Sequence, residues 1–258
     1  MHPVLFEIGD WPVYAYGVLL AVAYLAGLQL AVMRARRAGL DAARIMDLGI
    51  YLIIAALVGA KLMLVVVDFS YFREHPKELL SLVRVGGVFY GGLIGALLVG
   101  LVLVRRYKLP VWGAADMYAP GVALGHIIGR FGCFLAGCCY GRPTDLPWGV
   151  TFTSPVAAAS AGTPLGIPLH PTQLYDAGAE ALILLVLLVL ERRGKSYPGR
   201  TWWLYMLLYS IARFIVEIFR DDNRGIILGV STSQFVSLAL APIAVIMLIR
   251  LKNASRTA

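Results

Sequence analysis

Two arginine-bearing segments lie in sequence that is otherwise apolar enough to enter a membrane. The stretch "GRFGCFLAGCCYGRP", residues 129–143, contains Arg130 and all three cysteines of the chain. The stretch "YSIARFIVEIFR", residues 209–220, contains Arg213. Burying a guanidinium within a membrane costs free energy, so such side chains usually face a partner in the protein interior. The planar guanidinium also matches the geometry of a phosphate. We therefore expect Arg130 and Arg213 to hold an anion of phosphate chemistry between them.

The second stretch places its polar residues on one face of a helix. Tyr209, Arg213, Glu217 and Arg220 recur at i, i+4, i+8 and i+11. At 3.6 residues per turn these positions share one side, and Leu, Ile and Phe occupy the other. Glu217 has two interpretations, a structural ion pair with Arg213 or a direct contact in the chemistry. Arg220 either joins the site or extends its side chain to water.

A further polar cluster lies in "LHPTQLYDA", residues 169–177. Pro171 and Thr172 are suited to the start of a helix. His170, Gln173 and Tyr175 then lie near the membrane boundary as donors and acceptors. For His170 both a hydrogen-bonded interfacial role and the role of a base stay open.

The cysteines have the spacing C-x₄-C-C, which is not a standard zinc pattern, so we expect no metal site. Their expected position on the oxidising side allows a disulfide between Cys133 and Cys138. They could equally be small buried hydrophobic residues at a helix exit. A third alternative is a catalytic cysteine whose pKa is lowered by the adjacent arginines.

The elements that position these residues follow from the composition. Of the 258 residues, 59% are hydrophobic and 15% are charged, and the mean hydropathy is +0.76. Soluble domains are about 45–50% apolar and about 25% charged. The sequence therefore predicts an all-α polytopic membrane protein.

Seven segments have about the length and apolar character that a spanning helix needs. They are Trp11–Met33, Leu48–Val67, Val85–Val104, Leu109–Gly129, Leu174–Leu190, Thr201–Phe219 and Ile226–Ile249. Pairs of glycines four residues apart, Gly91 with Gly95 and Gly125 with Gly129, favour close packing of helices.

Basic residues predict the orientation of these spans. They are concentrated at 34–44, 105–108, 192–200 and 250–256, which follow alternate spans. Loops rich in Lys and Arg stay in the cytoplasm, so we expect the N-terminus outside and the C-terminus inside. This distribution also accounts for most of the net charge of +8, and we expect no nucleic-acid partner. Residues 1–258 are expected to form a single transmembrane domain with an extracytoplasmic loop insertion around 137–171.

With these motifs assembled, the chain resembles the prolipoprotein diacylglyceryl transferase family over nearly its whole length. The resemblance is carried by Arg130 with the glycine-rich turn after it, by "HPTQLY" and "YSIARFIVEIFR", and by "YGVLL" and "YGGLIG". It implies transfer of the diacylglyceryl group of phosphatidylglycerol to the lipobox cysteine thiol of prolipoproteins. A thioether forms and glycerol phosphate leaves. The resemblance also implies the bacterial inner membrane, an extracytoplasmic active site and no cofactor.

The resemblance implies site residues at matching positions. The catalytic residues would be Arg130, Arg213, His170, Tyr90 and Tyr209. The substrate-binding residues would be Arg130, Arg213, Tyr16, Gln173, Tyr175, Glu217, Arg220, Gly91 and Gly92. Two departures stand out: Tyr90 replaces the usual histidine, and Cys133, Ala136 and Cys138 replace two asparagines and a glutamate.

Residues and resemblance together predict one mechanism. Arg130 and Arg213 clamp the lipid phosphodiester and bind it more strongly as negative charge grows on the departing phosphate. The attacking thiol belongs to the substrate, and His170 is favoured over Tyr90 as the group that takes its proton, because tyrosine is a poor base. Alternatives are a diverged member that acts on another thiol or serves as a lipid-binding scaffold, and a small-solute transporter.

Overall fold

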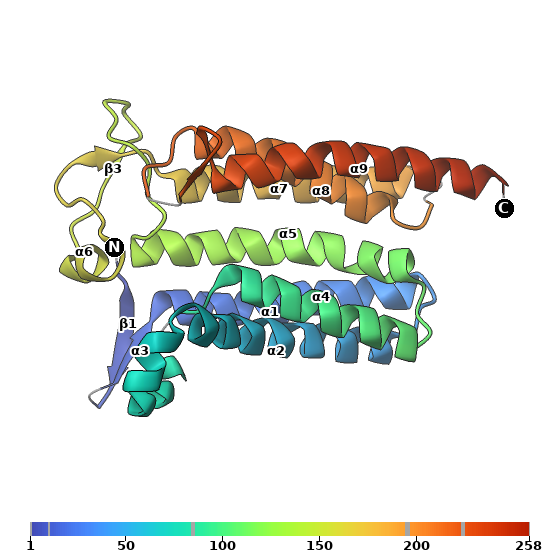
Figure 1. Cartoon of the computed structure of the whole chain (residues 1–258). Coiled ribbons are helices and arrows are strands. Elements are labelled where there is room, and N and C mark those ends of the chain that lie inside the picture. The colour runs from blue at the N-terminus through green and yellow to red at the C-terminus, as the bar shows by residue number, and fades with distance from the viewer. Residues whose placement is uncertain (1, 10, 84–85, 194–196, 223–224, 258) are drawn as a thin grey trace. The chain divides into compact units, whose positions relative to one another are not determined.

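The computed structural model describes residues 2–9, 11–83, 86–193, 197–222 and 225–257, and helices dominate it (Figure 1). The long helices are α1 Ala15–Arg37, α2 Ala42–Val67, α4 Phe89–Arg106, α5 Val111–Ala136, α7 Thr172–Arg193, α8 Arg200–Glu217 and α9 Thr232–Thr257. Shorter helical elements are α3 Phe69–Glu74, the 3₁₀ helix η1 Pro76–Val83 and α6 Pro155–Ala161. Short antiparallel pairs are formed by β1 Val4–Ile8 with β2 Trp11–Tyr14, β3 Val150–Thr151 with β4 Pro168–Leu169, and β5 Ile226–Ile227 with β6 Val230–Ser231.

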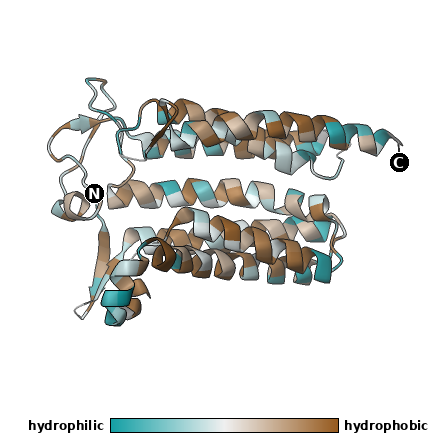
Figure 2. Ribbon diagram, viewed as in Figure 1, coloured by the Kyte–Doolittle hydropathy of each residue, from teal (hydrophilic) through white to brown (hydrophobic). Residues whose placement is uncertain are grey.

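The prediction of an all-α polytopic membrane protein is confirmed. Six of the long helices, all except α8, are long and apolar enough to cross a membrane, and hydrophobic residues cover much of their length (Figure 2). α8 carries Arg200, Arg213 and Glu217 within 18 residues, so its composition alone does not identify it as a span. The seventh span stays a prediction.

Two predicted spans include residues that form hairpins. Residues 11–14 form strand β2, which pairs with β1 across a turn at Gly9 (φ +61°). Ala15 donates its backbone N–H to the carbonyl of Pro3, so this hairpin joins the first turn of α1. Residues 226–231 form the second hairpin, β5–β6, and α9 begins only after it. The predicted start of the third span, Val85, lies outside the described residues, and this span also begins too early, because residues 86–88 are not helical and α4 begins at Phe89.

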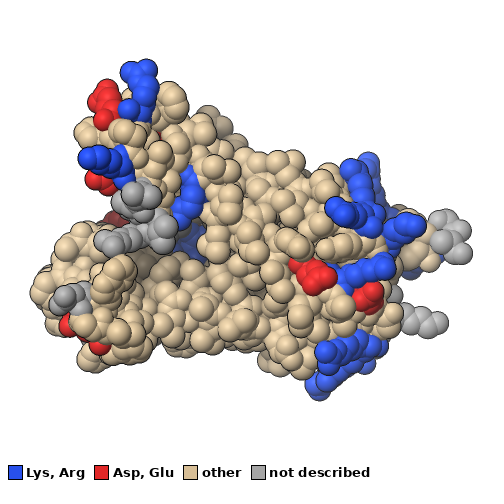
Figure 3. All heavy atoms as spheres, turned by 90° about the horizontal axis from the view of Figure 1, so that it is seen from below, with Lys and Arg blue, Asp and Glu red and all other residues tan. Residues whose placement is uncertain are grey.

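The basic residues gather where the apolar helices end. The last turn of α1 holds Arg34, Arg36 and Arg37, and the last turn of α4 holds Arg105 and Arg106. On the face drawn in Figure 3, Lys and Arg side chains gather toward the left and the right of the view, and other residues cover most of the area between. Basic residues in the last turns of α1 and α4 are what the predicted topology requires. The orientation itself stays a prediction.

The contacts of the chain fall into two compact units, and the single domain stays a prediction. One unit contains the described residues up to Leu30 together with those from Ala115 onward, and the other contains Ala31–Ala114. In the second unit α2 packs on α4 through glycines. A Cβ on Gly95 would lie 2.6 Å from the carbonyl oxygen of Ala55, and a Cβ on Gly91 would overlap Gly59. The close packing predicted for Gly91 and Gly95 is confirmed.

In the first unit, glycines also bring α1 against α5. A Cβ on Gly27 would lie 2.6 Å from the carbonyl oxygen of Gly121, and one on Gly125 would lie 3.2 Å from that of Ala23. Gly129 faces open space, so its predicted packing role is wrong; the close approach lies two turns earlier on α5.

A buried carboxylate connects α5 to the start of α8. The N-cap of α8 is Gly199, which offers no side chain to the free backbone N–H groups. Asp116 of α5 accepts the N–H of Gly199 at 2.7 Å and that of Trp202 at 2.8 Å. An acidic side chain inside α5 thus caps a neighbouring helix, where the helix dipole favours negative charge.

Candidate functional site

Three arginines from different parts of the first unit meet at one carboxylate oxygen. Asp176 Oδ2, at the start of α7, lies 3.1 Å from Arg130 Nη2 of α5 and 3.4 Å from Arg213 Nη1 of α8. The same oxygen lies 3.5 Å from Arg220 Nη1, three residues beyond α8. The side chains are almost fully buried, with Arg213 5% and Arg130 11% exposed. The structure therefore brings Arg130 and Arg213 together, around a residue that the predicted site did not include.

Two further carboxylates complete this cluster. Arg213 Nη2 lies 2.5 Å from Glu217 Oε2, and Asp222 accepts two hydrogen bonds of 2.8 Å from Arg220. Three guanidiniums thus face three carboxylates, and the formal charges balance. An incoming anion has to compete with a carboxylate, most directly with Asp176, which all three arginines share.

The two open interpretations of the α8 face are resolved in part. Glu217 is ion-paired with Arg213, and its other oxygen accepts a 2.9 Å hydrogen bond from Ser231 Oγ. Arg220 is buried in the cluster instead of extending to water. Burial lowers the pKa of Arg220, but hydrogen bonds to Asp222 outweigh this effect and the net shift of the pKa is upward.

A second polar layer lies one helical turn away from the arginines. His126, Glu180 and Tyr209 each lie four residues from a member of the first layer, on α5, α7 and α8 respectively. His126 Nδ1 lies 2.8 Å from Glu180 Oε1, and the rings of His126 and Tyr209 are 5.6 Å apart between centroids. Tyr209, a predicted site residue, therefore lies beside a histidine–carboxylate pair.

Each layer contains a buried polar atom without a hydrogen-bond partner among the described residues. They include Arg130 Nε in the first layer and Glu180 Oε2 in the second; Glu217 Oε2, also in the first layer, is ion-paired with Arg213. Buried polar groups are nearly always paired in folded proteins, so such exceptions mark places where a further molecule can bind. The two layers form the candidate site.

The predicted loop residues anchor the segment that follows α5. Gln173 Nε2 donates to the carbonyl of Cys138 at 2.6 Å, and Thr172 Oγ1 donates to that of Cys139 at 2.7 Å. The chain then runs beside Arg220, because the N–H of Arg142 bonds to the carbonyl of Phe219 and that of Gly141 to the carbonyl of His170. The first turn of α7 thereby fixes the backbone next to the arginines.

His170 and Tyr175 form a second anchored group. Tyr175 Oη accepts a 2.8 Å hydrogen bond from Trp148 Nε1 and lies 3.1 Å from His170 Nδ1. The His170 ring packs against Phe219, with 5.2 Å between ring centroids. One nitrogen of His170 is therefore already engaged by a tyrosine, whichever tautomer the ring adopts.

The three cysteines converge at the end of α5. Within the described residues none of the three forms a disulfide, and their sulfur atoms lie within 4.8 Å of one another. Hydrogen bonds with the thiols of Cys133 and Cys138 lower the pKa of Cys139, and the charges of Arg220 and Arg130 act in the same direction. Tyr16, another predicted site residue, packs at the start of α1 against Gly132 next to this cluster.

The remaining predicted residues lie in the second unit. Tyr90 is about half exposed, and Gly91 and Gly92 are buried where α4 packs on α2. Their participation in the site stays a prediction, because the two units are described separately.

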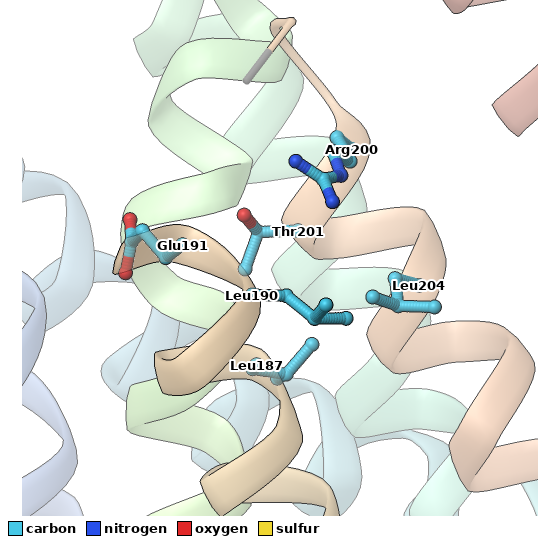
Figure 4. A pocket seen from close by; sticks show the side chains of 6 residues that line it. All are labelled: Leu187, Leu190, Glu191, Arg200, Thr201 and Leu204. Carbon is cyan, nitrogen blue, oxygen red and sulfur yellow. The ribbon is translucent and has the colours of Figure 1, made fainter. Parts of the chain in front are cut away.

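A hollow in the first unit lies far from the arginines. It is formed by the last turns of α7 and the first turns of α8, near Glu191 and Arg200 (Figure 4). Asp176 and Arg213 lie at the opposite ends of these two helices. The hollow is therefore separate from the arginine cluster.

Sequence relatives agree with the resemblance. A profile of the prolipoprotein diacylglyceryl transferase family matches residues 3–250. The phosphatidylglycerol–prolipoprotein diacylglyceryl transferase of Clostridium tetani is 39% identical over 238 residues, which cover 92% of this chain and 93% of the relative. The protein of the same name from Finegoldia magna is 31% identical over 253 residues, with 98% and 97% covered. The chain belongs to the prolipoprotein diacylglyceryl transferase family.

Proposed function

We propose that this chain transfers a diacylglyceryl group from phosphatidylglycerol to the lipobox cysteine of a prolipoprotein. A bond forms between the cysteine sulfur and the terminal glycerol carbon, and the bond from that carbon to the phosphate oxygen breaks. Glycerol phosphate is released. The family and the near full-length match to its members support this activity. The single structural observation behind the mechanism is the convergence of Arg130, Arg213 and Arg220 on one oxygen.

In this mechanism Asp176 occupies the position that a phosphate oxygen takes when lipid binds. The carboxylate oxygen lies 3.1–3.5 Å from three guanidiniums, which is a suitable environment for a lipid phosphodiester. The departing phosphate gains negative charge as the carbon–oxygen bond breaks. Fixed cations in a buried site stabilise that charge more strongly in the transition state than in the bound lipid, and this lowers the barrier.

The attacking thiol has to lose a proton, since a free cysteine with a pKa of about 8.5 is only a few per cent thiolate at neutral pH. His126 is the base that the geometry favours. When Nδ1–H donates to Glu180 Oε1, the lone pair on Nε2 is available to accept the thiol proton. That proton then passes to the leaving phosphate, so the step needs no other reactant.

The two bases predicted from sequence have weaker structural support. The Nδ1 of His170 faces the neutral hydroxyl of Tyr175, which stabilises a protonated imidazole less than the Glu180 carboxylate beside His126 does. Tyr90 belongs to the other unit, so its distance from Arg130 and Arg213 is not defined. His126 is instead one turn from Arg130 on the same helix.

We place the site on the extracytoplasmic side of the bacterial inner membrane. In the first unit, basic residues lie at the ends of α7 and α9 and at the start of α8, whereas the arginine cluster lies at the other ends of α7 and α8. Under the positive-inside rule, the cluster then faces the side on which secreted prolipoproteins emerge.

Mass spectrometry tests this function directly. Purified protein in detergent with phosphatidylglycerol should increase the mass of a lipobox peptide by that of diacylglycerol minus water. A peptide with serine in place of the cysteine is the matched control and should stay unmodified. An unmodified cysteine peptide, with the lipid bound to folded protein, would overturn the transfer and favour a lipid-binding scaffold.

A further inference from the structure

The proposed transfer reaction makes no use of the three clustered thiols. The acceptor sulfur belongs to the prolipoprotein, and a diacylglyceryl group on Cys133, Cys138 or Cys139 would be a stable thioether that could not be passed on. Yet these are all the cysteines in the chain, and their sulfurs lie within 4.8 Å of one another. The cluster therefore calls for a separate chemical explanation.

The backbone around the cluster is fixed in an unfavourable conformation. Cys139 has φ +62°, a left-handed conformation that residues other than glycine adopt rarely. The carbonyls of Cys138 and Cys139 are both held by side chains from the first turn of α7, at 2.6 and 2.7 Å. The conformation that brings the sulfurs together is thus stabilised from outside, which is how ligand sites are pre-organised.

The surroundings of the cluster are cationic. Arg130 precedes Cys133 by three residues on α5, and Arg220 lies beside the same Asp176 oxygen as Arg130. Hydrogen-bond donors and cations around sulfur ligands stabilise the deprotonated form that binds metals.

We propose that Cys133, Cys138 and Cys139 together bind one soft metal ion, for which Cu(I) is the best match. Within the described residues, the group of possible ligands consists of three sulfurs and contains no histidine or carboxylate. Zn(II) in structural sites takes four ligands, whereas soft thiolates select Cu(I). Each sulfur coordinates as a thiolate and releases its proton to solvent, with no change in oxidation state. This binding does not depend on the transfer reaction.

A Cu(I) titration tests the site. Full-length protein, reduced and kept without oxygen in detergent, competes for Cu(I) with a coloured Cu(I) chelator. We expect one Cu(I) per chain and an ultraviolet sulfur-to-copper absorption band. We expect each single substitution, Cys133→Ser, Cys138→Ser or Cys139→Ser, to weaken Cu(I) binding by more than about 100-fold. Loss of a residue that only hydrogen-bonds to a metal ligand already lowers metal affinity about 10–100-fold, and loss of a ligand itself should cost more.

Matched variants keep the test independent of folding. The variant with all three serines has no thiol at all, so it defines the baseline and should bind no Cu(I). Ser160→Ala removes a hydroxyl from α6 outside the cluster and should bind like the unmodified protein. Circular dichroism verifies that each variant retains its helices. Absence of binding by the reduced protein, or unchanged binding by a helical Cys139→Ser variant, would overturn the proposal.

Discussion

The two ends of α8 each lie against a buried aspartate, and the two aspartates are held in opposite ways. At the first turn, Asp116 accepts backbone N–H groups from Gly199 and Trp202. At the last turns, Asp176 is shared by Arg130 and Arg213 and by Arg220 beyond the helix. Asp116 caps the N-terminus of α8, whereas Asp176 is one carboxylate shared by three guanidiniums.

This difference separates a structural charge from a functional one. A helix N-terminus stabilises an anion with fixed dipoles, and those N–H groups need a cap in any folded state. Burying three guanidiniums around one oxygen costs free energy. Packing of helices does not require such charges, because α2 and α4 pack through glycines. A cluster of charges is therefore expected where an anionic substrate has to bind, and four substitutions test this comparison.

The largest effect is expected from Asp176→Asn, which leaves three buried guanidiniums with two carboxylates. Removing one partner from a buried ion pair costs about 3–5 kcal/mol, so the unfolding temperature in detergent should fall sharply. Inorganic phosphate should restore part of the stability, because it can occupy the vacated anion position. The unmodified protein should gain little from phosphate. Equal stabilisation of both proteins would contradict the idea that Asp176 holds the place of a phosphate.

Arg213→Ala should lower the rate of diacylglyceryl transfer by about 10²–10³, the usual loss when one donor to a developing negative charge is removed. The variant should remain helical in the membrane, and the peptide mass assay measures the loss. Arg213→Lys keeps the charge without the planar fork, and we expect it to recover only part of the rate. Full activity of the alanine variant would refute the clamp.

His126→Ala should slow transfer by about 10², within the range for loss of a general base. Added imidazole should raise the rate of this variant, because a small base can enter the space that the ring leaves. His170→Ala serves as the comparison and should show no such rescue. If imidazole rescues the His170 variant alone, the base has been assigned to the wrong histidine.

Asp116→Ala gives the smallest effect. Loss of the cap on α8 should cost about 1–2 kcal/mol of stability, as for other N-cap substitutions. Thermal unfolding measures this cost, and phosphate should not restore it. Transfer activity per folded molecule should stay unchanged. A large loss of activity in folded protein would remove the distinction between the two aspartates.

The sequence predicted those features that depend on local pattern. Long apolar runs identified the helices, and the spacing from Tyr209 to Glu217 correctly indicated a polar face, whereas Arg220 lies beyond the end of α8. The residues from 11 and from 226 were assigned to helices, although they form hairpins, because short apolar runs have no period that separates strand from helix. Only the flanking turns at Gly9 and Gly229 distinguish them.

The partners of the arginines were harder to predict. Asp176, Glu180 and His126 were not among the predicted site residues. Glu180 lies four residues after Asp176, and His126 lies four residues before Arg130, which is the spacing that also links the polar residues of α8. Which helices face one another depends on tertiary packing, and no local pattern contains that information. The convergence of the thiols likewise depends on the left-handed backbone of Cys139.

The N-terminal hairpin has a consequence for the behaviour of the protein in different bilayers. β1 and β2 leave Phe6, Ile8 and Trp11 exposed, and the hairpin is hydrogen-bonded to the first turn of α1. Aromatic and apolar residues at a helix end settle at the interface between acyl chains and water. α1 cannot slide along the membrane normal without moving these side chains out of that interface. When the acyl chains become longer or shorter, we therefore expect α1 to change its tilt relative to the membrane normal, so that its tilt angle depends on membrane thickness.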